Sequence, residues 1–209
     1  WGLGKSTFIN YVCHFLNHNH KEKTPLVVRF NPWQLSGHED LTRRFFLELS
    51  LELRAKAEEL TKAGELTTAA AHKISEAAKA IADFADSFTE LPGWVHSITG
   101  GLSAGVSILK LFKKRKKPLE DERAKLEVLL KETGKKILVV IDDLDRLETE
   151  DIRDMMRMVK SVANFPNVLY LLAFDQKIVS AALNNIQGTE DGKSYLEKII
   201  QVDFTLPPP

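Results

Sequence analysis

The sequence has one cysteine, Cys13, and no net charge, since 29 lysine and arginine residues balance 29 aspartate and glutamate residues. A single cysteine excludes an internal disulfide framework and fits a reducing compartment, so we expect a cytoplasmic protein. The balanced charge argues against a surface that binds nucleic acid over its whole extent, because such domains usually carry a basic excess. At 209 residues, 44% of them hydrophobic, the chain is long enough to bury a core without disulfides or a structural metal.

An initiator methionine and a signal-peptide pattern are also missing from the start of the sequence. The first residues, Trp-Gly-Leu-Gly-Lys-Ser-Thr, already lie inside a glycine-rich turn, and the last three residues are prolines that follow an apolar run. We therefore expect residues 1–209 to be a fragment of a longer protein.

Helical and strand patterns alternate along most of the chain. Helices are predicted from residue 5 to about 17, after a capping box at 36–39, and over 66–88, 119–130, 149–162, 176–183 and 195–200. Apolar strands are predicted at 25–30, 136–143, 167–174 and 201–206. Strands that alternate with helices and are apolar on both faces are typical of an α/β fold, a parallel sheet between two layers of helices.

The first residues supply most of a phosphate-binding loop, whose full pattern is G-x-x-x-x-G-K-[ST]. Gly2 and Gly4 allow successive backbone N–H groups to curl around phosphate oxygens at the start of a helix. Lys5 would reach the β- and γ-phosphates, the hydroxyl of Ser6 would bind Mg²⁺, and Thr7 completes the motif. A plain glycine turn that caps a helix is the alternative interpretation.

The acidic partner that such a loop requires follows the apolar run Ile137–Ile141. Asp142 would emerge at the carboxyl edge of the sheet and hold Mg²⁺ through water. Either Asp143 or Asp145 would polarise the attacking water as a general base. The alternative is that these acids simply favour the start of the next helix.

Some further residues have two possible roles. Asp175, directly after the predicted strand 167–174, would either sense the γ-phosphate or cap the following helix. Nothing in the spacing selects Arg29 or Arg146 as a group that neutralises charge in a transition state. Trp33, after Asn31 and Pro32, is expected in the core.

A histidine-rich helix end raises the possibility of a metal site. His14 and His18 have helical i, i+4 spacing, and Cys13 and His20 are close by in the sequence. We favour solvated imidazoles at the end of a helix, with Cys13 buried against the sheet, and therefore expect no metal site there.

Taken together, these motifs resemble the KAP family of P-loop NTPases. The resemblance rests on the following segments in this order: Trp-Gly-x-Gly-Lys-Ser-Thr, Phe-Asn-Pro-Trp at 30–33, Ile-Asp-Asp-Leu-Asp-Arg at 141–146, Ala-Phe-Asp at 173–175, and Leu-Glu-Lys-Ile-Ile-Gln-Val-Asp-Phe at 196–204. It implies a three-layer, additional-strand P-loop fold with sheet order 5-1-4-3-2, whose first strand would precede Trp1. It also implies Walker A and Walker B motifs that bind and hydrolyse ATP with Mg²⁺, and a switch role in membrane-associated signalling or phage exclusion.

Residues 50–130 lie outside the resemblance and are predicted to be a helical insertion. Lys5 and Asp142 must share a compartment, so the chain between them must cross a bilayer an even number of times. The stretch 91–112 is the only candidate span, because charged residues exclude a span at 66–88. One crossing alone would separate Lys5 from Asp142, so a true span at 91–112 is not expected. Two interpretations stay open: a helix buried within the insertion, or a segment in a membrane surface with Lys113–Lys117 on anionic head groups.

The sequence thus predicts an ATPase that acts as a nucleotide-dependent switch on an unknown protein effector, and oligomers are possible. One rival is a scaffold that binds ATP with little turnover. A second rival is an adaptor that uses the basic run 113–117 to bind a membrane surface or nucleic acid. No guanine-specific Asn-Lys-x-Asp follows a strand, which favours adenine.

Overall fold

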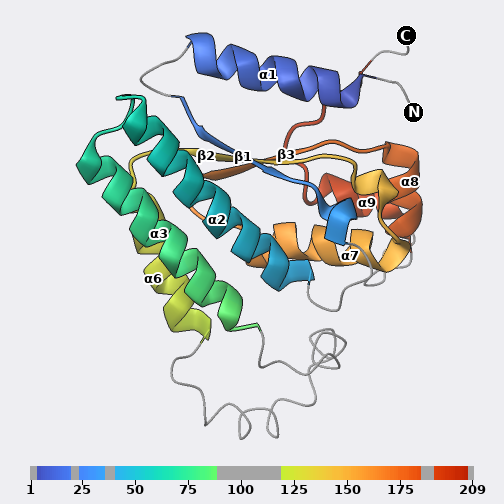
Figure 1. Ribbon diagram of the computed structural model, residues 1–209. Coiled ribbons are helices and arrows are strands. Elements are labelled where there is room, and N and C mark those ends of the chain that lie inside the picture. The colour runs from blue at the N-terminus through green and yellow to red at the C-terminus, as the bar shows by residue number, and fades with distance from the viewer. Residues whose placement is uncertain (1–3, 20–23, 36–40, 89–118, 185–190, 207–209) are drawn as a thin grey trace, which may run out of the picture.

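A three-stranded parallel sheet lies at the centre of the computed structural model, which describes residues 4–19, 24–35, 41–88, 119–184 and 191–206. The strands are β1 (Leu26–Phe30), β2 (Ile137–Ile141) and β3 (Val168–Leu172), in the order β1-β2-β3. Leu26 aligns with Ile137, and Ile137 aligns with Val168. Helices lie over both faces of the sheet, which confirms the α/β class (Figure 1).

Helix α1 (Lys5–Asn19) covers one face of the sheet (Figure 1). Ile9 and Cys13 on its inner side pack with Val140 of β2, and all three are buried. The predicted burial of Cys13 is therefore confirmed. The first turn of α1 lies near the carboxyl ends of the strands (Figure 1).

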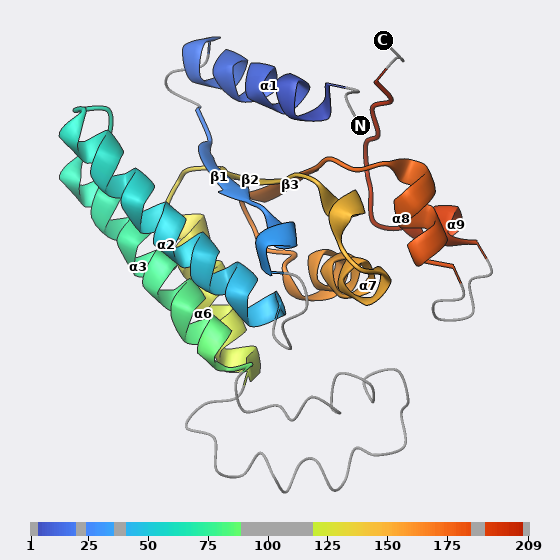
Figure 2. The same cartoon turned by 45° about the vertical axis from the view of Figure 1, so that its right-hand side comes forward.

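Three helices pack side by side on the opposite face of the sheet. They are α2 (Leu41–Lys62), α3 (Thr68–Asp86) and α6 (Leu119–Glu132) (Figure 2). The predicted inner positions of α2 are buried as expected: Leu41, Phe45, Leu49 and Leu53. The capping box at 36–39, the apolar stretch 91–112 and the basic run 113–117 lie outside the described residues.

Aromatic contacts join these helices to the sheet in one core. The rings of Phe45 on α2 and Phe30 on β1 meet edge to face, with centroids 5.0 Å apart. The next residue, Phe46, packs in the same way on Phe84 of α3, at 5.1 Å. The buried hydroxyl of Ser50 donates a hydrogen bond of 2.7 Å to the carbonyl of Ala78. Helices from the predicted insertion therefore share the hydrophobic core of the sheet.

The region between β2 and β3 differs slightly from the predicted single helix 149–162. An α-helix, α7 (Thr149–Arg157), continues into a π-helical turn, η4 (Met158–Val162). The hydroxyl of Tyr170 on β3 donates a hydrogen bond of 2.7 Å to the carbonyl of Ala163, just after this turn. Burial raises the pKa of this hydroxyl above its ordinary range, so it stays a donor.

Two predictions near the end of the chain were wrong in part. The last helix, α9 (Gly192–Glu197), begins and ends about three residues earlier than the predicted 195–200. The predicted strand 201–206 is not a strand, and Val202 and Phe204 are 67% and 77% exposed. A strand needs a neighbouring backbone to pair with, and within the described residues no strand pairs with this segment.

Strand β3 is also less buried than its apolar sequence predicted. Leu169 is exposed, and the other residues of this strand are half-buried. The reason is that β3 lies at an edge of the described sheet, so one side of the strand lacks the cover that β2 receives.

None of the described helices is both long enough and apolar enough to cross a bilayer. The stretch 91–112 is not part of the described structure.

Close packing between α8 (Gln176–Ala182) and α9 predicts that Gly192→Ala destabilises the protein. A Cβ atom at Gly192 would lie 1.9 Å from the backbone oxygen of Ser180. Relieving that overlap requires α9 to move, so we expect a loss of about 1–3 kcal/mol in the free energy of unfolding. Urea denaturation measures this, with Lys193→Ala on the exposed side of α9 as the control. Equal midpoints for Gly192→Ala and the wild type would contradict the packing.

Candidate functional site

The candidate site lies where α1 begins and β2 ends. Gly4 has a φ of +74°, a conformation that favours glycine, and its carbonyl accepts the first helical hydrogen bond, 2.8 Å from the backbone N–H of Phe8. The first turn of α1 lies at the carboxyl ends of the strands (Figure 1), and the first N–H groups of a helix have no partner within the helix. Gly2 lies outside the described residues, and Thr7 is exposed.

Lys5 contacts an acid that is distant in sequence. Its Nζ lies 3.0 Å from both carboxylate oxygens of Asp145, 140 positions further along the chain. The side chains are only 23% and 13% exposed, so the ion pair is partly shielded from water. Within the described residues, the acid that pairs with Lys5 is thus Asp145, on the turn after β2.

Ser6 meets the first acid after β2. Its hydroxyl donates a hydrogen bond of 2.6 Å to Oδ2 of Asp142, and Oδ1 of the same carboxylate accepts the backbone N–H of Asp143 at 2.8 Å. Hydroxyl and carboxylate oxygens are the hard ligands that Mg²⁺ prefers, and a directly bound serine beside a carboxylate that acts through water fits its octahedral shell. The two residues therefore fit the predicted metal site.

Asp143 has an unusual backbone and a cationic partner. Its φ and ψ are 59° and 34°, in the left-handed region. Its Oδ1 lies 3.1 Å from Nε of Arg146, the last residue of the short 3₁₀ turn η3 (Leu144–Arg146). The guanidinium of Arg146 in turn lies 5.8 Å from the centre of the Trp33 ring.

The prediction that Trp33 belongs to the core was wrong, because its side chain is 41% exposed. It lies on the 3₁₀ turn η1 (Pro32–Leu35) that follows β1. In this turn Pro32 is buried and the next residue points outward. Sequence reasoning missed the contact between Trp33 and Arg146, and the only available signal was that both follow parallel strands that end at the same edge.

Asp175 caps a helix, which is one of its two predicted roles. Its Oδ1 accepts the backbone N–H groups of Lys177 at 2.8 Å and Ile178 at 3.3 Å, at the start of α8. Arg29 on β1 donates to Oδ1 of Asn10 on α1 at 2.7 Å, so it ties the helix to the sheet. A role for Asp175 in sensing phosphate stays a prediction.

Within the described residues, no group of three potential metal ligands is found. The side chains of His18 and His20 lie outside the described residues, so the absence of a metal site at this helix end stays a prediction. His14 is exposed whereas the neighbouring Cys13 is buried, so the two side chains point in different directions.

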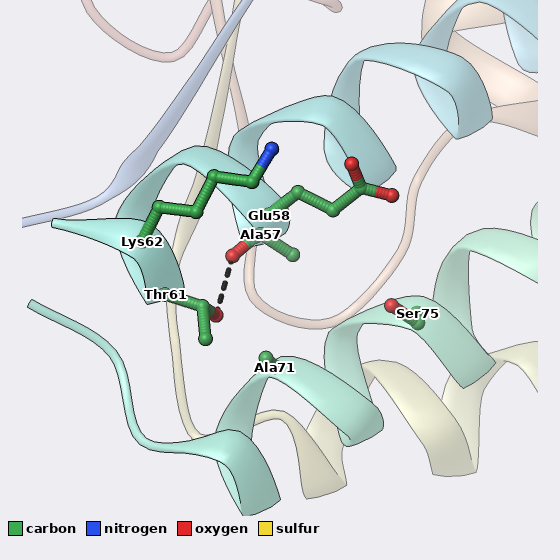
Figure 3. Close-up of a pocket in the computed structure, with 6 residues that line it drawn as sticks. All are labelled: Ala57, Glu58, Thr61, Lys62, Ala71 and Ser75. Carbon is green, nitrogen blue, oxygen red and sulfur yellow. Dashed lines mark hydrogen bonds between the residues drawn. The ribbon is translucent and has the colours of Figure 1, made fainter. Parts of the chain in front are cut away.

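A surface hollow lies away from this site, between α2 and α3 (Figure 3). Its lining residues are Ala57, Glu58, Thr61, Lys62, Ala71 and Ser75. The hydroxyl of Thr61 donates a hydrogen bond of 2.7 Å to the carbonyl of Ala57, so this hydroxyl is already bonded within α2. The hollow has no cluster of groups comparable with the one at the end of β2.

Comparison with known proteins agrees with the geometry. The sequence model of the KAP family P-loop domain matches residues 1–209. The phage T7 exclusion protein of Escherichia coli strain K12 is 28% identical over 221 residues, an alignment that covers 100% of this chain and 29% of that protein. The chain therefore spans less than a third of that relative's length. Because the family model matches the whole chain, this chain belongs to the KAP family of P-loop domains.

Proposed function

We propose that this domain binds ATP with Mg²⁺, hydrolyses it, and acts as a nucleotide-dependent switch. The observation that carries the proposal is the meeting of two distant segments. Lys5 and Ser6, at the start of α1, bond to Asp145 and Asp142, which follow β2. A P-loop NTPase needs a phosphate-binding lysine and a magnesium carboxylate at one place, and few other functions require this pair.

Each residue has a separate role in this proposal. The backbone around Gly2 and Gly4, with Thr7, would cradle the phosphates, and Lys5 would contact their β- and γ-oxygens. Ser6 and Asp142 would hold Mg²⁺, which when bound neutralises charge on the phosphates. Most of the rate enhancement would come from positioning and electrostatic stabilisation.

Asp143 is the preferred residue for orienting the attacking water. Both carboxylate oxygens of Asp145 contact Lys5, whereas the ion pair of Asp143 with Arg146 engages Oδ1. We therefore propose that Asp143 orients the attacking water. Asp145 would instead hold the ammonium group of Lys5.

Release of inorganic phosphate tests the proposed function. The protein is incubated with ATP, with Mg²⁺ or with a chelator in its place, and bound nucleotide is measured in parallel. We expect release that requires Mg²⁺. Binding without release would instead support a scaffold that uses ATP only as a ligand.

Asp145→Asn is expected to tighten ATP binding. The carboxylate competes with phosphate oxygens for the ammonium of Lys5, and it adds a negative charge close to the phosphates. An ion pair with this exposure contributes roughly 1 kcal/mol, so we expect an affinity about fivefold higher. Titration calorimetry measures the change, with Asp121→Asn on α6 as a control for the loss of one negative charge. Weaker binding would show that Asp145 positions Lys5 for the nucleotide.

We also propose the full sheet order 5-1-4-3-2. The described strands β1, β2 and β3 would be strands 2, 3 and 4 of that order. The position of β3 at an edge of the described sheet supports this arrangement.

The biological setting is inferred from the family and from the relative's name. We propose that the switch serves phage defence or signalling, and that nucleotide state acts on a protein effector through the helical insertion 50–130. A cytoplasmic location, possible oligomers and peripheral membrane contact through 91–117 stay predictions, and a nucleic-acid partner is not expected.

A further inference from the structure

Three side chains from two turns meet beside the acidic end of β2. Trp33 lies on η1 after β1, Arg146 lies on η3 after β2, and Asp143 joins β2 to η3. The two turns contact each other. Because parallel strands deliver their following turns to the same edge of a sheet, these three residues share the edge that holds Lys5 and Asp142.

Arg146 contacts Asp143 through both its backbone and its side chain. Its backbone N–H donates to the carbonyl of Asp143 at 3.0 Å, and its Nε lies 3.1 Å from Oδ1 of the Asp143 side chain. The left-handed backbone of Asp143 is unfavourable for a residue with a Cβ atom, and such a conformation persists only where the surroundings impose it. Arg146 is thus well placed to fix both the backbone and the carboxylate of Asp143.

Trp33 in turn limits the movement of Arg146. The guanidinium lies 5.8 Å from the centre of the indole ring, within the range of a cation–π contact. Both side chains are more than 40% exposed, at 41% for Trp33 and 42% for Arg146. Neither residue therefore fills the core, and a role confined to packing does not explain their position.

The same turn also carries the acid that contacts Lys5. Asp145 precedes Arg146 on η3 and lies 3.0 Å from Nζ of Lys5. A shift of η3 would therefore move Asp143 and Asp145 together. An attacking water must be held within a few tenths of an ångström of its reactive position, so small shifts of Asp143 reduce turnover.

From this geometry we propose that Arg146 is a positioning residue for hydrolysis and that Trp33 supports it. Arg146 orients the carboxylate of Asp143, and the Trp33 ring restricts the guanidinium to the side of Asp143. Neither residue contributes to the affinity for the phosphates. This inference rests on the proposed ATPase activity and adds the residues that set its rate.

The test compares turnover with affinity in the full protein. Arg146→Gln removes the charge and the Nε contact, and we expect kcat to fall about tenfold or more while the Kd for Mg-ATP stays within about twofold. Trp33→Ala is expected to lower kcat by about three- to fivefold, and Trp33→Phe, which keeps an aromatic face, to restore most of it. Arg157→Gln is the matched control, because this arginine pairs with Asp154 within α7 and is expected to leave both constants unchanged.

The outcomes separate this inference from the proposed function. Wild-type turnover with an unchanged kcat in Arg146→Gln overturns the inference alone. A loss of affinity that matches the loss of kcat also overturns it, because Arg146 would then contact the nucleotide or support the whole site. A wild type that releases no phosphate overturns both claims. Thermal unfolding shows whether Arg146→Gln folds. If it does not fold, the comparison of Trp33→Ala with Trp33→Phe tests the proposal instead. Equal kcat values for those two variants would reject it.

Discussion

Lys5→Ala is expected to weaken Mg-ATP binding by about 10²-fold, the effect of removing one charged donor from a site that binds developing or fixed negative charge. Lys5 is the cation that the structure places at the start of α1, with its Nζ at hydrogen-bond distance from the turn after β2. Its replacement removes a direct phosphate contact and also leaves the carboxylate of Asp145 without this partner, so the local charge becomes more negative. Titration calorimetry with Mg-ATP measures the loss.

The matched control for this variant is Lys136→Ala. Lys136 is exposed and lies just before β2, at the opposite edge of the sheet from Lys5. Its removal changes the net charge by the same amount but leaves the site intact, so the affinity should be unchanged. Similar losses in the two variants would mean that overall charge, and not a specific contact, governs binding.

Asp142→Asn is expected to reduce Mg²⁺-dependent hydrolysis by about 10²- to 10³-fold, the usual cost of losing one electrostatic element of a catalytic site. Both oxygens of this carboxylate are engaged, by the hydroxyl of Ser6 and by the backbone N–H of Asp143. Asparagine has nearly the same shape and can keep one acceptor, but it lacks the negative charge that attracts a divalent cation. Phosphate release at increasing Mg²⁺ concentrations measures the effect.

We expect the Asp142→Asn variant to need much more Mg²⁺ for any remaining activity. Asp83→Asn on α3 is the control, since this acid is exposed and lies 3.8 Å from Lys125 of α6, away from the site. An Asp142→Asn variant with the Mg²⁺ requirement of the wild type would show that this carboxylate has no part in holding the ion.

The parts of the fold that were predicted well depend on strong local patterns. The run Ile137–Ile141 is apolar at every position, and such a run is stable only as a covered strand, which β2 is. Apolar residues with i, i+4 spacing likewise predicted the buried side of α2. The meeting of Ser6 with Asp142 followed from topology, because parallel strands bring their carboxyl ends to one edge.

The parts that were missed depend on tertiary contacts. An apolar segment such as 201–206 has the composition of a strand, but pairing requires a neighbouring backbone that local sequence does not specify. Trp33 is a large aromatic residue and was expected in the core, but the 3₁₀ turn buries Pro32 instead. The choice of Asp145 as the partner of Lys5, and of Arg146 as the partner of Asp143, depends on the direction of side chains on η3, which spacing alone cannot give.

The most direct test of the central claim is a crystal structure of the protein with Mg²⁺ and a non-hydrolysable ATP analogue. The account predicts the triphosphate at the start of α1, with Nζ of Lys5 on a terminal phosphate oxygen and the hydroxyl of Ser6 on a magnesium ion beside Asp142. A nucleotide bound elsewhere, or a phosphate chain that touches neither Lys5 nor the acids after β2, would contradict it.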